Sequence, residues 1–162
     1  MSTWSELETS LTAAIAGLAD DAWVTLEAPP REAAVPPADD APAGGRLRRL
    51  FGGGKGAAPG GIVLQLRRQG TYLYGECTGG PAVGGDFGWT DAEHTALLGL
   101  GWGTPPHIGA RVYLRHFPGD DGPPPAEYLE DGLADEAVTL VVRTLRDVYG
   151  LTAPETVTLT WP

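Results

Sequence analysis

The sequence lacks several features that would define a class of protein. It contains one cysteine, Cys77, so no disulfide can form within the chain. No apolar run approaches the roughly 18 residues that a membrane-spanning helix needs. The first residues, MSTWSELETS, hold no basic stretch followed by an apolar one, so we expect no signal peptide. Together these absences favour a cytoplasmic globular protein.

Positive charge is also scarce. The 162 residues include 11 lysines and arginines against 21 acids, which gives a formal net charge of −10. General binding of nucleic acid or of an anionic membrane requires the opposite sign, so the composition argues against both. The exception is one basic cluster, formed by Arg46, Arg48, Arg49 and Lys55. Peripheral membrane binding through residues 46–55 stays an alternative, although each basic charge contributes only about 1 kcal/mol at such a surface.

Residue patterns typical of catalysis are missing as well. The segment GGGKG lacks the serine or threonine that follows the lysine of a phosphate-binding loop. The three histidines share no helical face and have no metal-ligand spacing. Cys77, in a predicted strand, fits a core residue better than a nucleophile. We therefore expect no enzyme, no metal and no cofactor. A small enzyme or ligand-binding protein that uses the region of Trp102 is the alternative.

Hydrophobic periodicity predicts three helices. Two of them begin with the same signal, because Thr3 and Thr90 are each followed three residues later by glutamate, as in a capping box. The third is expected over about 128–149, with Gly150 ending it. Its apolar residues are too many for one stripe, so this helix is either central in the fold or meets a dimer partner.

Alternation of apolar and polar residues predicts the strands, and the second and third of them form a hairpin. The predicted strands are 23–27, 62–68, 71–77, 110–117 and 156–161. Strands and helices in this order predict an α+β fold, in which three helices pack on one face of a mostly antiparallel sheet.

Residues 28–60 stand apart from this pattern. They are rich in proline and glycine, and they hold too little apolar surface to offset the entropy of ordering them. We expect a single domain over residues 1–162, with 28–60 as a disordered insertion that carries the basic cluster.

The segment ALLGLGWGTPP, residues 96–106, marks the end of the second helix. Gly99 or Gly101 would supply the left-handed conformation that ends a helix, and Pro105 prevents its continuation. Trp102 is then expected to fold back into the core as a structural residue. The alternative role of Trp102 is to stack against a ligand.

The open face of the sheet is the first candidate for a binding surface. Arginines interleaved with aromatic residues are typical of surfaces that bind proteins or peptides. The alternation of the strands is expected to place five such residues outward: Arg67, Arg111, Tyr113, Arg115 and Phe117. The alternative is a solvated sheet face with cross-strand packing.

Two motifs resemble a known superfamily. They are Leu100-Gly101-Trp102 followed by Pro105, and the run TLRDVYG at the end of the third predicted helix. In these the chain resembles the YbjN-like and type III secretion chaperone-like superfamily, over everything but the insertion. The resemblance implies helices on a twisted antiparallel sheet, frequent dimerisation, binding of another protein as a chaperone or adaptor, and no catalytic centre. One departure is the last strand, since the secretion chaperones end on the third helix.

Overall fold

The computed structural model describes residues 3–31, 60–104, 111–118 and 132–162. Most of the predicted insertion lies outside these ranges. So do several residues singled out from the sequence: Arg46, Arg48, Arg49, Lys55 and Pro105. What the sequence predicts for these residues stays a prediction.

Within the described ranges the chain forms helices and strands in the predicted order. The helices are α1 (Trp4–Ala16), α2 (Asp91–Leu100) and α3 (Leu133–Arg143). The strands are β1 (Trp23–Glu27), β2 (Val63–Gln69), β3 (Tyr72–Thr78), β4 (Val112–Phe117) and β5 (Thr158–Thr160). Three short helical turns are η2 (Pro81–Val83), η3 (Thr144–Val148) and η4 (Pro154–Thr156).

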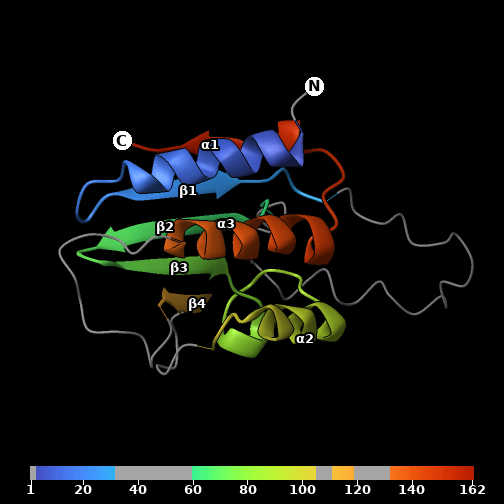
Figure 1. Ribbon diagram of the computed structural model, residues 1–162. Coiled ribbons are helices and arrows are strands. Elements are labelled where there is room, and N and C mark those ends of the chain that lie inside the picture. Colours follow the sequence, from blue (N-terminus) through green and yellow to red (C-terminus); the bar gives the residue numbers. More distant parts are fainter. Residues whose placement is uncertain (1–2, 32–59, 105–110, 119–131) are drawn as a thin grey trace, which may run out of the picture.

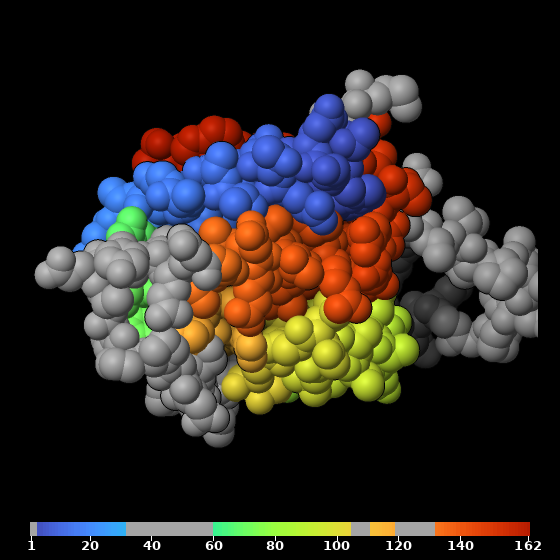
Figure 2. All heavy atoms as spheres, viewed as in Figure 1, coloured from blue at the N-terminus to red at the C-terminus, as the bar shows by residue number. Residues whose placement is uncertain are grey.

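The strands form one sheet in the order β4-β3-β2-β1-β5, and each neighbouring pair is antiparallel. All three helices lie on the same face of this sheet (Figure 1). Figure 2 shows them as adjoining bands, with α3 between α1 and α2. The predicted α+β architecture is therefore confirmed.

Local signals in the sequence fix the helix ends. The Thr3 hydroxyl accepts from the backbone N–H of Glu6, and the Glu6 carboxylate accepts from that of Thr3, which completes a capping box. Thr90 and Glu93 repeat the arrangement at α2. At the other end of α2, Gly101 takes φ 108°, a left-handed conformation that favours glycine.

The core fills the space between the sheet and the helices, and Trp102 belongs to it with only 2% of its surface exposed. Its indole Nε1 donates to the hydroxyl of Thr144 at 2.8 Å, and that hydroxyl donates to the carbonyl of Leu140 at 2.8 Å. On the sheet side the ring lies against Gly75 of β3, where any side chain would be within 3.4 Å of it. Trp102 thus has the core position expected of it, and its ring leaves no face for a ligand.

The third helix begins later than predicted but ends where it was predicted to, at Tyr149 before Gly150, which has φ 79°. α3 begins at Leu133, after Gly132 in a left-handed conformation with φ 95°, rather than near residue 128. It then continues as a π-helical turn, η3, in which the N–H of Tyr149 donates to the carbonyl of Thr144 at 2.8 Å. Apolar residues on more than one side of α3 are buried against α1 and the sheet. Its excess of apolar residues therefore reflects a central position in the fold.

The first described part of residues 28–60 belongs to the fold, so the predicted boundary at residue 28 was wrong. Ala28 is buried, and its N–H donates to the carbonyl of Ile62 at 3.0 Å, which extends the pairing of β1 with β2. A side chain on Gly61 would collide with the Ala28 carbonyl. Contacts with the fold continue as far as Arg31, which forms an ion pair with Glu93 and lies over the ring of Trp89.

No helix among the described residues is long and apolar enough to cross a membrane.

Candidate functional site

The structure separates the five residues that the sequence placed on the open face of the sheet. Tyr113 and Phe117 of β4 are fully buried and face the helices. The reason is the register with β3, in which Tyr113 lies opposite Cys77 and Phe117 opposite Leu73. Both partners belong to the core. Arg115 shares the alternation of Tyr113 and Phe117, so the outward placement predicted for these three residues is wrong.

Arg67 alone of the five lies on the open face of a central strand. Across the sheet it stands between Trp23 of β1 and Tyr74 of β3, and Tyr74 stands opposite His116 of β4. The rings of Tyr74 and His116 are 4.9 Å apart. An arginine among aromatic residues does occur on this face, but its aromatic neighbours are not the ones predicted.

Arg111 belongs to neither group. It precedes β4, its side chain is exposed, and its guanidinium lies 3.9 Å from the carboxylate of Asp86. The predicted residues therefore form no single surface.

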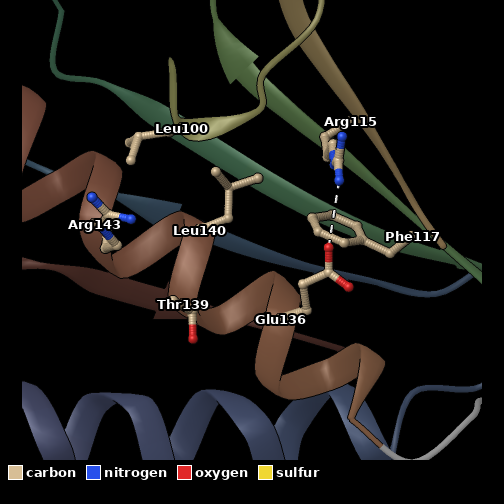
Figure 3. Close-up of a pocket in the computed structure, with 7 residues that line it drawn as sticks. All are labelled: Leu100, Arg115, Phe117, Glu136, Thr139, Leu140 and Arg143. Atoms are coloured by element: carbon tan, nitrogen blue, oxygen red, sulfur yellow. Dashed lines mark hydrogen bonds and ion pairs between the residues drawn. The ribbon is translucent and has the colours of Figure 1, made fainter. Parts of the chain in front are cut away.

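Arg115 and Phe117 instead line a cleft on the helix side of the sheet. The cleft has a volume of about 280 Å³ and lies between the end of α2, strand β4 and the exposed side of α3 (Figure 3). Its lining residues are Leu100, Arg115, Phe117, Glu136, Thr139, Leu140 and Arg143. Sequence reasoning missed the contribution of α2 and α3, because only the folded chain brings these elements to β4.

The cleft combines an apolar floor with charged ends. Leu100, Leu140 and Phe117 supply the apolar surface (Figure 3). At one end the Arg115 guanidinium lies 5.6 Å from the centre of the Phe117 ring and 3.4 Å from the carboxylate of Glu136. Arg143 stands at the other end (Figure 3).

Among the described residues, the carboxylates that pair with the two arginines of the cleft belong to exposed side chains. Arg143 bonds at 3.3 Å to the carboxylate of Asp147, which also accepts from Arg146 at 2.7 Å. The hydrogen bond from Arg146, followed by that from Arg143, lowers the pKa of Asp147. Because exposed ion pairs contribute little, Arg115 and Arg143 can exchange their partners at small cost.

The described residues do not assemble another recognisable chemistry. Cys77 is buried in the core, and burial raises the pKa of its thiol well above the usual range, which disfavours the reactive thiolate. His94 shares a hydrogen bond of 2.7 Å with the hydroxyl of Tyr113. Within the described ranges, no three metal-ligating side chains come together.

Comparison with known proteins completes the description of the site. No curated protein and no solved structure matches the chain. The family model described as T3SS (YopN, CesT) and YbjN peptide-binding chaperone 3 matches residues 1–161, a range that includes the segment set apart as an insertion. The chain therefore belongs to this T3SS and YbjN peptide-binding chaperone family, as its sequence motifs predicted.

Proposed function

We propose that this protein is a non-catalytic chaperone or adaptor that binds a segment of another protein through the cleft between α2, β4 and α3. Membership of a peptide-binding chaperone family supports the general role. The observation that carries the location is the apolar floor of the cleft with Arg115 and Arg143 at its ends.

The size of the cleft limits what it can hold. A volume of about 280 Å³ lies just below the range of about 300–1,000 Å³ typical of small-molecule sites. It suits one large apolar side chain, held against Leu140 and Phe117, while the rest of the segment lies along the surface. A single anchor in a desolvated pocket contributes most of the affinity in many interfaces.

The two arginines of the cleft determine which residues of the bound segment can flank its apolar anchor. Arg115 lies at one end of the cleft and Arg143 at the other, so acidic residues on either side of an apolar anchor would match both. Complementary charge of this kind mainly adds specificity and speeds association. The proposed ligand is thus an extended segment with an apolar residue flanked by acids.

The experiment begins by identifying the partner by affinity capture from the native cell and mass spectrometry. Binding of the purified partner segment is then measured for the wild type, Arg115→Glu and Arg143→Glu. We expect each reversal to weaken binding at least tenfold, or about 1.4 kcal/mol, with the fold intact by circular dichroism.

Arg67→Glu is the matched control, because it reverses an equally charged residue on the opposite face of the sheet. We expect it to change binding less than twofold. If Arg67→Glu abolishes binding and the cleft variants do not, the segment binds on the open face instead. Turnover of a small molecule would overturn the non-catalytic role altogether.

A cytoplasmic location and a homodimer are part of the same proposal. The location is proposed from the single cysteine, and the homodimer from the dimerisation that the sequence resemblance implies. Fractionation of the native cell tests the first, and sedimentation equilibrium of the purified chain tests the second.

A further inference from the structure

A second constellation lies at the other end of α2 and α3, around the side chain of Arg31. Its guanidinium carbon is 4.5 Å from the centre of the Tyr149 ring and 5.2 Å from that of the Trp89 ring. One terminal nitrogen lies 2.7 Å from the Glu93 carboxylate, and the other donates to the carbonyl of Val148 at 3.4 Å. We call Trp89, Glu93 and Tyr149 the arginine cage.

The walls of the arginine cage are held by contacts that do not involve Arg31. Trp89 and Tyr149 are buried, and the indole of Trp89 donates to the carbonyl of Thr78 at 2.8 Å. Phe87 packs beside both rings, at 4.8 Å from Trp89 and 6.1 Å from Tyr149. The Glu93 carboxylate also accepts from the N–H that caps α2. The cage is therefore expected to keep its shape when the cation leaves.

The chemistry of the cage selects a guanidinium. Flat aromatic faces and a carboxylate edge match a planar, delocalised cation, whereas an ammonium has no flat face to stack. The backbone that leads to the bound arginine is also held in place, because the Tyr149 hydroxyl donates to the carbonyl of Pro29 at 2.6 Å. Pro29 and Pro30 then lead into Arg31, so the bound segment has the sequence Pro-Pro-Arg.

The fit of Arg31 is incomplete. Its Nε is buried without a hydrogen-bond partner among the described residues, which costs free energy. A third of the side chain also stays exposed. Arg31 thus shows that the cage binds a guanidinium. Because Arg31 is linked to β1 by only a few residues, its side chain does not reach a position in which every N–H has a hydrogen-bond acceptor.

We propose that the arginine cage is a binding site for an arginine within an extended, proline-containing segment of another polypeptide, and that Arg31 occupies it as a competitor from the same chain. The site is distinct from the cleft, since Glu93 lies near the start of α2 and Leu100 at its end. The strongly acidic chain as a whole also favours a basic ligand.

Competition by Arg31 follows from its covalent tether. A tethered group reaches effective concentrations of about millimolar, so a free peptide of the same intrinsic affinity must exceed this level to displace it. Removal of the Arg31 guanidinium should therefore reveal binding that the wild type suppresses.

The test uses the ¹⁵N-labelled full chain and the probe acetyl-EAPPR-amide, which copies residues 27–31. The readout is the indole N–H signal of Trp89, assigned with Trp89→Phe. We expect Arg31→Ala to bind the probe with a half-saturation at least tenfold below that of the wild type. Acetyl-EAPPA-amide should leave the signal unchanged, and acetyl-EAPPK-amide should bind more weakly.

A second substitution tests the carboxylate of the cage. Glu93→Gln in the Arg31→Ala background should raise the half-saturation at least fivefold. The proposal is overturned if folded Arg31→Ala shows no saturable shift, or if the alanine probe shifts it equally. Should Arg31→Ala not fold, Arg31→Gln keeps the side-chain stem and takes its place. These measurements need no natural partner, so their result is independent of the proposed role of the cleft.

Discussion

Arg31 and Arg115 show how two arginines of equal exposure can be held very differently. Their side chains are 33% and 35% exposed, and each lies over an aromatic ring and beside a glutamate. Arg31 has two rings and a carboxylate oxygen at 2.7 Å, whereas Arg115 has one ring and an oxygen at 3.4 Å.

The difference lies in the partners rather than in the arginines. The Glu93 side chain, beside Arg31, is 20% exposed and is also bonded to the cap of α2, while the Glu136 side chain, beside Arg115, is 52% exposed on α3. A fixed, shielded carboxylate holds its cation, and an exposed one exchanges it with water and ions. At one end of the α2–α3 layer a shielded carboxylate therefore holds the chain's own arginine, and at the other an exposed carboxylate leaves its arginine able to exchange partners.

The largest effect is expected from a change to Trp102, a core residue on which both the cleft and the arginine cage depend. Trp102→Ala should lower the free energy of unfolding by about 3–5 kcal/mol, because it leaves a cavity between β3 and α3 and removes the indole N–H that donates to the Thr144 hydroxyl. Chemical denaturation measures this. Trp23→Ala is the matched control, since 47% of Trp23 is exposed, and it should cost less than about 1 kcal/mol. A loss below 1 kcal/mol for Trp102→Ala contradicts its core role.

The second prediction compares the contributions of Arg31 and Arg115 to stability. Arg31→Ala should lower stability by about 1–2 kcal/mol through its two cation–π contacts. Arg115→Ala should lower it by less than about 0.5 kcal/mol, as for an exposed ion pair. Urea titrations of the two variants decide the matter, and equal losses would remove the distinction between them.

The third prediction separates Arg31 from the segment that follows it. Replacement of residues 32–59 by a Gly-Ser linker of half the length, with Arg31 kept, should change stability by only about 0.6 kcal/mol. Adding Arg31→Ala to the shortened chain should then cost the same as in the full chain. A shortened chain that does not fold shows that these residues are part of the fold. Thermal unfolding of the four proteins gives the answer.

The smallest effect depends on pH. Burial raises the pKa of Glu93, but its hydrogen bonds with Thr90 and its attraction to Arg31 lower it overall. A pKa lowered by folding stabilises the protein above the unfolded value of about 4.3 and loses that contribution as pH falls through the folded value. The stability difference between wild type and Glu93→Gln should thus be constant from pH 6 to 8 and shrink below about pH 4. In Arg31→Ala the difference should be smaller throughout.

Elements with local signals could be predicted from the sequence. The capping boxes at Thr3 and Thr90 depend on residues three positions apart and lie where they were predicted, and Gly101 is one of the two glycines predicted to end α2. The side of β4 that faces the core could not be predicted this way. One alternation carries Tyr113 and Phe117 and the other carries valine, leucine and histidine, so both mix apolar with polar residues. Pairing with β3 decides between them.

The two binding regions were beyond a sequence argument for a related reason. The arginine cage joins Arg31 to Trp89 and Glu93 around the start of α2 and to Tyr149 just after η3, all of which are distant from Arg31 in sequence. A proline pair in a glycine-rich stretch looks like a linker, and nothing nearby indicates its partner. The cleft likewise depends on Leu100 and Leu140 meeting beside β4.

Because of the π-helical turn η3, the direction in which Tyr149 points depends on the number of residues in the third helix as well as on their identity. A π turn holds one residue more than an α-helical turn. Because of the extra residue, Thr144 can accept the hydrogen bond from Trp102 while the ring of Tyr149 contacts both Trp89 and Arg31. Deleting one residue within η3 would restore the α-helical phase and rotate Tyr149 by about 100°. An insertion or deletion within η3 would therefore disrupt arginine binding at Tyr149 and leave the core contact between Thr144 and Trp102 in place, more than a substitution would.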